Sequence, residues 1–574
     1  MANATLTQAP APPAPQLNTG PVSIFFMVWG VTWTMLLVLG MAFLYYNRAM
    51  PLVRIRGLRL TFAAVILLHL YWIVVQFGVL IFELVPPEVM FWIMGLYVPW
   101  GIALFHASNS RFLYVAEAQK RFVGKTPVVR EKPSTSRDET LLGKFWRLEY
   151  ERRIVVVVCV GMVLQFLLLV TMYLLSRKYH PSFGIPGTEI TTADPMERLM
   201  QLYSGWEWWP SIMWQFFWAW IVAPYILFKS RGIKDTLGWR VQTIACCIAG
   251  LPATPLWLAA LYLPAFAPVN RYFIPPQWIC LSITFIEFFA VILPCWQVLT
   301  HKTLRRETLD AIANWESRRG GDTDGKQSFV TDSTKQESTT ATWRLLSEIE
   351  KATGQSESLF TMAALDYTLK RNPEPLREFS ALRDFSGENI AFLTAVADWK
   401  AGAAKSRAST DEGSVRSEEG VERRRVRFNG ALQIYAEFIS ARLAEFQVNI
   451  GSADQKRLEG VFGPAAQILF GDAQTFDDPA VPFKMERTDN AVERGRAQYF
   501  GQVPEEFDDD IFDDAQVSIK YLVLTNTWPK FVKQGRCSMS VHSVGSQSSD
   551  GNAGNEIGRV KKYLKRMKAG TAAF

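Results

Sequence analysis

The chain has 574 residues, of which 49% are hydrophobic, 13% aromatic and 20% charged, and its formal net charge is +7. All of the basic excess lies in the first 300 residues, which hold 23 Lys and Arg against 14 Asp and Glu. This basic excess lies among apolar runs rather than on a basic, groove-lining domain, which excludes nucleic-acid binding. The length of the apolar runs excludes a fully soluble protein.

Seven apolar runs in the first half of the chain are each long enough to cross the roughly 30 Å hydrocarbon core of a bilayer as a helix. They cover residues 22–46, 59–83, 88–110, 154–176, 207–228, 242–268 and 277–300. We therefore expect an all-α protein in which residues 22–300 form a seven-helix transmembrane bundle. The Pro- and Ala-rich residues 1–21 lack the charged segment and cleavage site of a signal peptide and predict a short extracellular tail.

The loops between these runs differ sharply in charge, because those on one side carry 22 Lys and Arg and those on the other side carry four. The positive-inside rule then places the N-terminus outside and the C-terminus in the cytoplasm. We expect a multi-pass protein of the plasma membrane. Asn3 begins an Asn-Ala-Thr sequon on the predicted outer side and is a candidate glycosylation site.

Polar side chains inside the apolar runs are candidates for function, because they are costly in hydrocarbon. Glu287 lies near the middle of the seventh run, and His69 and His106 in the second and third runs are its candidate partners. Two interpretations stay open: a hydrogen-bonded structural link between helices, or a site that senses or binds a small ligand. The six cysteines show no CxxC or Cys/His spacing, so we predict neither a metal site nor a cofactor.

The second half of the chain has a mixed helical pattern without alternating β-branched runs, which predicts a second, cytoplasmic all-α domain. Two stretches within it, near 401–428 and 461–510, are poor in large apolar residues or rich in turn and acidic residues, and we expect disordered inserts there. After the bundle, residues 301–319 predict a juxtamembrane amphipathic helix or a cytoplasmic extension of the last span. The segments that follow are a flexible linker at 320–342, the helical domain at 343–535, and a Ser-rich, basic, disordered tail at 536–574.

Three helical blocks of this domain carry a resemblance to a known family. The first block reads LREFSALRDFSGENIAFL from Leu376 to Leu393. The other two blocks read IYAEFI and QVNI within 434–450, and FDDAQV, YLVL and WPKF within 512–531. In this order the blocks resemble the RGS box, the domain of regulators of G-protein signalling. A seven-span half joined to such a box resembles the seven-transmembrane RGS proteins of fungi and plants.

The resemblance implies a helical bundle that accelerates GTP hydrolysis by a G-protein α subunit (Gα) and thereby damps the signal. The chain itself is then no enzyme, because Gα performs the hydrolysis. The family's Gα-contacting positions match the following residues: Phe385, Ser386, Glu388, Asn389, Asn449, Leu522, Asn526, Thr527 and Lys530. Alternatively, Glu388 and Asn389 serve only to cap a helix, and Asn449 is an ordinary turn residue.

Two positions depart from the family's pattern, since Asn526 stands where aspartate is usual and Lys530 where arginine is usual. An ammonium beside an amide is a less directional pair than a guanidinium beside a carboxylate, so the third contact segment is expected to be looser. The expected partners are Gα, the lipid bilayer and a candidate small-molecule ligand of the seven spans. Two alternatives remain: a ligand-sensing receptor that controls the box, and a membrane scaffold that binds Gα without accelerating hydrolysis.

Overall fold

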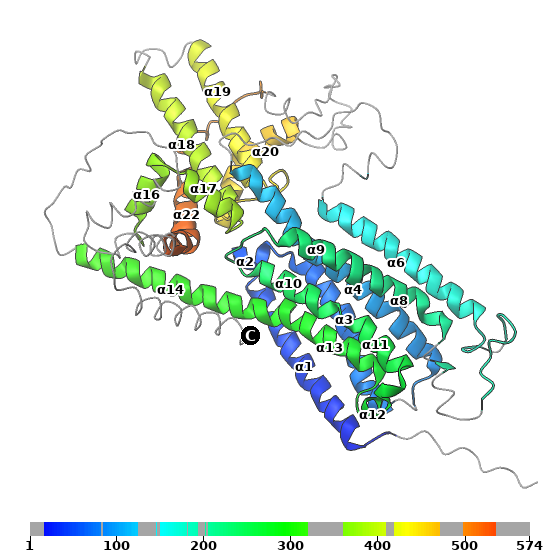
Figure 1. The fold of residues 1–574 in the computed structure, drawn as a ribbon. Helices are drawn as coiled ribbons and strands as arrows, with labels where there is room; N and C mark the ends of the chain where they lie inside the picture. Colours follow the sequence, from blue (N-terminus) through cyan, green and yellow to red (C-terminus); the bar gives the residue numbers. More distant parts are fainter. Residues whose placement is uncertain are drawn as a thin grey trace, which may run out of the picture. The chain divides into compact units, whose positions relative to one another are not determined.

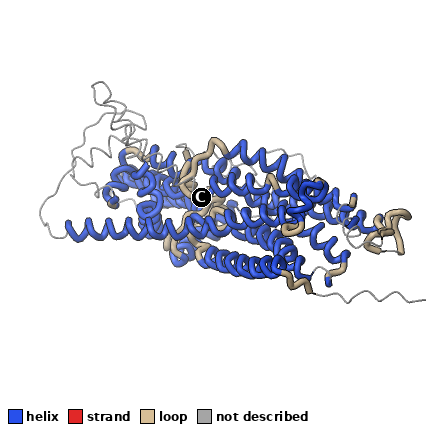
Figure 2. Tube along the Cα trace, turned by 60° about the horizontal axis from the view of Figure 1, so that its bottom comes forward, coloured by secondary structure: helices blue, strands red, loops and turns tan. Residues whose placement is uncertain are grey.

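The computed structural model describes residues 17–81, 84–123, 150–180, 182–192, 205–319, 360–408, 418–470 and 498–534, with Phe145, Gln201 and Leu202. All regular structure in these residues is helical, and no strand occurs among them (Figure 2). They form two compact units, the first comprising residues up to Thr303 with Leu382–Phe385, and the second comprising the others.

The first unit contains, within the described residues, seven helices that are long and apolar enough to cross a membrane. They span Pro21–Tyr46, Leu58–Ile81, Pro87–Phe122, Arg152–Leu175, Trp206–Ser230, Trp239–Tyr262 and Pro275–Asp310. Each overlaps one of the seven runs expected from hydropathy. The chain is therefore an all-helical protein with the character of a multi-pass membrane protein.

Three of the spans are single α-helices from end to end, and a fourth ends in one 3₁₀ turn (Figure 1). These are α1 (Pro21–Tyr46), α3 (Leu58–Ile81), α6 (Tyr150–Leu175) and α4 (Pro87–Gln119), which runs on into η2 (Lys120–Phe122). Short segments α2 (Pro51–Arg54), η5 (Pro264–Phe266) and α12 (Ala267–Asn270) lie between spans, and η3 (Trp206–Trp208) is the first turn of the fifth span.

The fifth, sixth and seventh spans are interrupted helices. The sixth consists of α10 (Trp239–Gly250) and α11 (Ala253–Tyr262), which meet at Pro252, where proline lacks the N–H that would continue the helix. The other two each contain one π-helical segment. The fifth comprises α8 (Trp209–Phe216), η4 (Phe217–Val222) and α9 (Ala223–Ser230); the seventh comprises α13 (Pro275–Glu287), η6 (Phe288–Ile292) and α14 (Leu293–Arg319).

Helices α3 and α4 pack closely because a glycine faces a large side chain at their crossing. A Cβ atom added at Gly101 of α4 would lie 2.8 Å from two side-chain carbons of Leu68 and 3.1 Å from its backbone nitrogen. Leu68 belongs to a buried cluster with Trp33, Trp72 and Ile283, which brings α1 and α13 against the same pair of helices. Close contact of this kind is typical of helix packing in membranes, where small residues let two helix backbones approach each other.

We expect Gly101→Ala to push α3 and α4 apart and to lower the stability of the first unit by about 1–3 kcal/mol, the usual cost of overpacking. The measurement is thermal unfolding of the full chain in detergent. Gly78→Ala is the matched control, because a Cβ there would meet no atom within 4 Å. Equal melting temperatures for the two variants would contradict the close approach.

Besides residues 304–319 of α14, the second unit consists of helices of which two run on into a π-helical segment. In chain order these are α16 (Met362–Arg371), α17 (Glu374–Leu382), α18 (Gly387–Ala408), α19 (Glu418–Ile434) with η8 (Tyr435–Ile439), α20 (Ser452–Phe470), and α22 (Asp513–Leu522) with η10 (Val523–Thr527). Its core is aromatic: the ring of Phe462 stacks on those of Phe428, Tyr435 and Phe512.

Polar contacts at the edge of this aromatic core join α18, α19 and the segment before α22. The guanidinium of Arg427 lies 4.0 Å above the ring of Trp399 and donates to Asp509 and to the Trp399 carbonyl oxygen. The Trp399 indole donates in return to the Arg427 carbonyl oxygen at 3.1 Å. A planar guanidinium suits this combination of stacking and forked hydrogen bonding.

The expectation of disorder at 401–428 and 461–510 is wrong for much of both stretches. Helix α18 continues to Ala408, and α19 begins at Glu418, because these polar residues are good helix formers and pairs such as Glu422–Arg425 support an exposed helix. Helix α20 continues through Pro464 to Phe470, since its apolar face is buried and outweighs the cost of the proline. Residues 498–510 are described and pack through Phe507, whereas 409–417 and 471–497 lie outside the described residues.

Residues 301–319 are helical, as expected, and they continue the seventh span as one helix, α14, which is the second of the two predicted arrangements. Several other predictions fall outside the described residues. They concern Asn3 and most of the tail 1–21, the linker 320–342, residues 343–359, and the tail 536–574.

Candidate functional site

Glu287 is the centre of a buried polar cluster inside the first unit, at the last residue of α13. Its side chain is fully buried, and its Oε2 atom accepts a hydrogen bond from the Trp33 indole at 2.6 Å. Its Oε1 atom lies 3.0 Å from Nδ1 of His69, whose Nε2 lies 3.0 Å from the Thr34 hydroxyl. The predicted pairing of Glu287 with His69 is therefore confirmed, and α1 supplies two further partners that the sequence did not indicate.

His106 does not join this cluster. It lies on α4, is buried, and stacks on Trp218 of the π-helical segment η4 with ring centroids 5.8 Å apart. Its Nδ1 atom and the Trp218 indole nitrogen have no hydrogen-bond partner among the described residues. The prediction that His106 partners Glu287 is wrong, because α4 presents this imidazole to the fifth span instead of the seventh.

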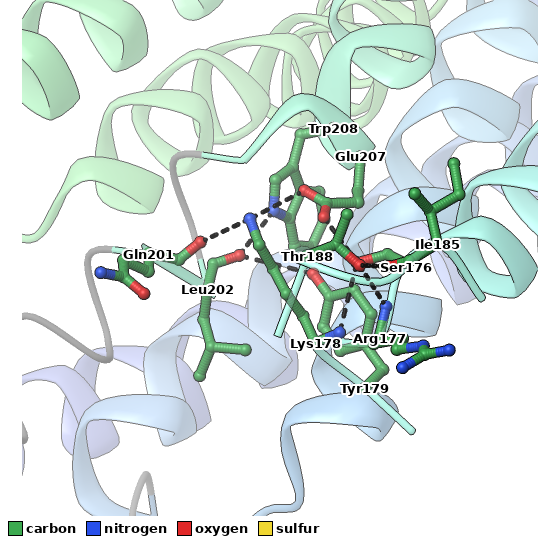
Figure 3. Close-up of polar contacts among 10 residues, drawn as sticks. All are labelled: Ser176, Arg177, Lys178, Tyr179, Ile185, Thr188, Gln201, Leu202, Glu207 and Trp208. Carbon is green, nitrogen blue, oxygen red and sulfur yellow. Dashed lines mark hydrogen bonds and ion pairs between the residues drawn. The ribbon is translucent and has the colours of Figure 1, made fainter. Parts of the chain in front are cut away.

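A second polar cluster joins the end of α6 to the start of the fifth span (Figure 3). The fully buried Glu207 accepts from the Ser176 hydroxyl at 2.6 Å and pairs with Lys178 Nζ at 3.2 Å. Lys178 also donates to the carbonyl oxygen of Gln201, and the Trp208 indole donates to that of Leu202. The loop after α6 is thereby tied to the helix that follows it by a buried ion pair.

A third cluster lies between the first two spans and the loop before α10. Arg56 is buried, and its Nη2 donates to the carbonyl oxygen of Leu237 at 2.9 Å and to Gln297 Oε1 at 2.6 Å. Burial lowers the pKa of Arg56 to about 10, and Asp235 opposes that shift. Burial raises the pKa of Asp235 in turn, against the hydrogen bonds that it accepts from the backbone N–H groups of Trp239 and Arg240. This arrangement fixes the loop before α10 against the seventh span.

The predicted Gα-contacting residues form three segments: the first holds Phe385, Ser386, Glu388 and Asn389, the second Asn449, and the third Leu522, Asn526, Thr527 and Lys530. The structure brings the first and third segments together. The hydroxyl groups of Ser386 and Thr527 lie 3.2 Å apart, although 141 residues separate them. Two hydrogen bonds hold Ser386 to Ser380. The Ser380 hydroxyl donates to the Ser386 carbonyl oxygen, and the Ser380 carbonyl oxygen accepts from the Ser386 backbone N–H. The residue before it, Phe385, has φ = 48°, a left-handed conformation that is uncommon outside glycine. The loop between α17 and α18 thus has a fixed and unusual backbone.

The predicted contact residues differ in exposure. Ser386, Glu388, Asn389 and Thr527 are buried, and so is Phe385. Asn449 is exposed, whereas three others are half-buried, namely Leu522, Asn526 and Lys530. Asn449 therefore presents the most accessible amide of the set. Among the described residues, no hydrogen bond links the Asn449 side chain to the Ser386–Thr527 pair.

Asn389 lies in the first turn of α18, where a capping role was the alternative. Its Oδ1 atom is buried and accepts no hydrogen bond from the described residues. An unpaired buried acceptor is costly, and it is unlike a cap, whose purpose is to pair a side-chain oxygen with backbone N–H groups.

Two π-helical segments lie next to the predicted contact residues. Segment η10 contains Asn526 and Thr527, and η8 immediately precedes the loop that carries Asn449. That loop is tied back to η8, because the Val448 N–H donates to the Phe438 carbonyl oxygen and the Gln447 amide donates to that of Ile439. Such π-helical turns are rare and occur frequently at functional sites.

Comparisons with protein-family models, curated proteins and solved structures find no match to this chain. The resemblance to the RGS box thus depends on the residue blocks alone. Among the described residues, no group of three or more His, Cys, Asp or Glu side chains is placed to hold a metal ion.

Sequence reasoning missed the Lys178–Glu207 pair, the Arg56–Gln297 contact and the indole of Trp33. The signal for the first was present, because a glutamate at the edge of an apolar run requires a partner, and Lys178 lies in a loop with few cations. The partners of Arg56 and of Glu287 are all more than 180 residues distant in sequence, so no local pattern indicates them.

Proposed function

We propose that the chain is a membrane-tethered regulator of heterotrimeric G-protein signalling, whose second unit accelerates GTP hydrolysis by Gα and thereby damps the signal. In this proposal the membrane is the plasma membrane, the N-terminus is extracellular and the second unit is cytoplasmic. Tethering raises the concentration of the helical unit near membrane-bound Gα without any new contact. The chain performs no hydrolysis itself.

One observation carries the proposal: the first and third of the blocks that resemble the RGS box meet in space through the Ser386–Thr527 hydroxyl contact. The first block lies on α17 and α18, the second on η8 and the loop after it, and the third on α22 and η10. Apart from Leu382–Phe385, blocks that are far apart in sequence are thus parts of one helical unit. This supports a shared surface made from the loops that the resemblance assigns to Gα.

The proposed activity does not require these side chains to supply a catalytic acid, base or arginine. Gα holds Mg²⁺, a glutamine that orients the attacking water, and an arginine in cis. An activator needs only to bind the switch loops better in the transition state than in the ground state. Uncharged amides such as those of Asn389 and Asn449 suit this task, because they bind backbone and glutamine groups without adding charge beside the γ-phosphate.

The experiment that tests this proposal is a single-turnover GTP hydrolysis assay with Gα and the full chain in lipid nanodiscs. We expect the hydrolysis rate to rise with the concentration of the chain, and nucleotide release to stay unchanged. Binding to Gα without any acceleration would favour the scaffold alternative, and absence of both would refute the proposed partner.

A second candidate function is a ligand-sensing receptor that controls the helical unit. The buried Glu287 cluster favours it, because ionisable groups inside a membrane bundle commonly mark functional sites. Comparing the acceleration of hydrolysis by the full chain in nanodiscs with and without candidate nutrients or lipids tests this function. A ligand-dependent change in rate that Glu287→Gln removes would support it.

A further inference from the structure

The hydrogen bonds around His69 fix the position of one proton. The Thr34 hydroxyl donates its only proton to the Gly30 carbonyl oxygen at 2.7 Å. Its oxygen therefore accepts in the contact with His69 Nε2, so Nε2 carries a hydrogen atom. The tautomer of a histidine follows from its partners in this way.

The opposite side of the imidazole then requires a second proton. Nδ1 of His69 and Oε1 of Glu287 lie 3.0 Å apart, and the Trp33 indole occupies Oε2. A hydrogen bond between Nδ1 and Oε1 needs one proton between them, on the carboxyl group or on the imidazole. Both arrangements leave the pair without net charge, which is the state that a fully buried site tolerates.

We propose that His69 and Glu287 form a proton-binding site that fastens the seventh span to the first two, and that loss of this proton releases the seventh span. Removal of the proton leaves a carboxylate oxygen facing a nitrogen lone pair, with a net negative charge in a site whose carboxylate is 0% exposed. The pair then repels instead of binding. Helix α13 loses one of its polar contacts with α3 and keeps the Trp72–Thr284 and Gln76–Gln277 hydrogen bonds, while the charge left on Glu287 is uncompensated.

The seventh span has a segment that can respond to this loss. The π-helical segment η6 begins at the residue after Glu287 and packs on α1. A Cβ atom added at Gly40 of α1 would lie 2.8 Å from a side-chain carbon of Val291, and the Cys295 thiol donates to the Gly40 carbonyl oxygen at 3.4 Å. This close contact lies directly beyond the proton site along the span. Cys295 therefore reports whether the seventh span stays packed on the first.

The surroundings of the pair contain no other charge that would compensate for the lost proton. On α1, α3, α10, α11 and α13, the formally charged side chains besides Glu287 are Arg59 and Arg240, each the second residue of its helix. The titratable groups in the same buried cluster are Tyr71, Cys246 and Cys280. The neighbouring α4 adds Tyr97, which packs against this cluster, and His106, which faces Trp218.

The test uses the full chain in nanodiscs and the reagent N-ethylmaleimide, over a pH series from about 6 to about 10. Mass spectrometry measures the labelling rate of Cys295 relative to that of N-acetylcysteine in the same buffer, which reports the intrinsic pH dependence of a thiol. Because one proton is lost, we expect the ratio to rise with pH by up to about tenfold per unit through the transition. It stays low below the transition.

Glu287→Gln is the matched variant, because its amide accepts from Trp33 and donates to Nδ1 but has no proton to lose. We expect its ratio to stay low and flat across the series. Glu287→Ala removes both hydrogen bonds and is expected to give a high ratio at every pH. A flat ratio in the unaltered chain, or a rise of equal size in Glu287→Gln, would overturn the proposal, because other titratable groups would then control the span.

Discussion

Replacing Asn449 with alanine is expected to reduce the acceleration of GTP hydrolysis by about a hundredfold or more, the usual cost of losing one well-placed polar group in a transition state. Asn449 is exposed, and the loop that carries it is held to η8 by the hydrogen bonds of Gln447 and Val448. Its amide is thus presented on a fixed backbone. The measurement is single-turnover hydrolysis by Gα with the full chain in nanodiscs.

The matched control for this change is Gln467→Ala, which removes an exposed amide from α20. We expect its hydrolysis rate to equal that of the unaltered chain. Thermal unfolding serves as the check on the fold, because both positions are exposed and neither variant is expected to change the melting temperature. Undiminished acceleration by Asn449→Ala would refute the assignment of this residue to the Gα contact.

Replacing Lys178 with methionine is expected to destabilise the first unit by about 3–5 kcal/mol, because it leaves the buried Glu207 carboxylate without its cation. The remaining partner, the Ser176 hydroxyl, does not compensate for the lost charge. Thermal unfolding of the full chain in detergent measures the effect. A loss of this size lowers the melting temperature by several degrees.

Two controls separate the buried ion pair from a general effect of losing a lysine. Lys120→Met breaks an exposed pair with Glu117, whose side chains are 58% and 74% exposed, and is expected to cost less than about 1 kcal/mol. The double variant Lys178→Met/Glu207→Gln removes both charges and is expected to be more stable than Lys178→Met alone. Equal melting temperatures for Lys178→Met and Lys120→Met would contradict a structural role for the buried pair.

Hydropathy predicted the seven spans well, because the length and composition of a run decide whether it can cross a bilayer. The details within the spans depend on packing and were harder to predict. Helix α4 continues beyond the polar residues after His106, because these residues find partners there. The Asn109 amide donates to Cys247 Sγ and to the Thr243 carbonyl oxygen, and Arg111 donates to the Ile55 carbonyl oxygen. The π-helical segments likewise have no sequence pattern that distinguishes them from α-helix.

In the second unit, the sequence led us to predict less helix than the structure contains. Low hydrophobicity predicted disorder where polar residues in fact extend α18 and α19, because a helix with one buried end does not need a large apolar face at the other. The candidate contact loops were identified by resemblance, and their proximity was expected. The burial of Ser386 and Thr527 was not, since it depends on how α17, α18 and η10 pack together.

The measurement that tests the central claim most directly is the affinity of the full chain in nanodiscs for Gα in two states. One state carries GDP with aluminium fluoride, which imitates the transferring phosphoryl group, and the other carries GDP alone. The account predicts that the chain binds the first state at least about tenfold more tightly, because an activator gains its effect from preferring the transition state. Equal affinity for both states, or no binding to either, would contradict it.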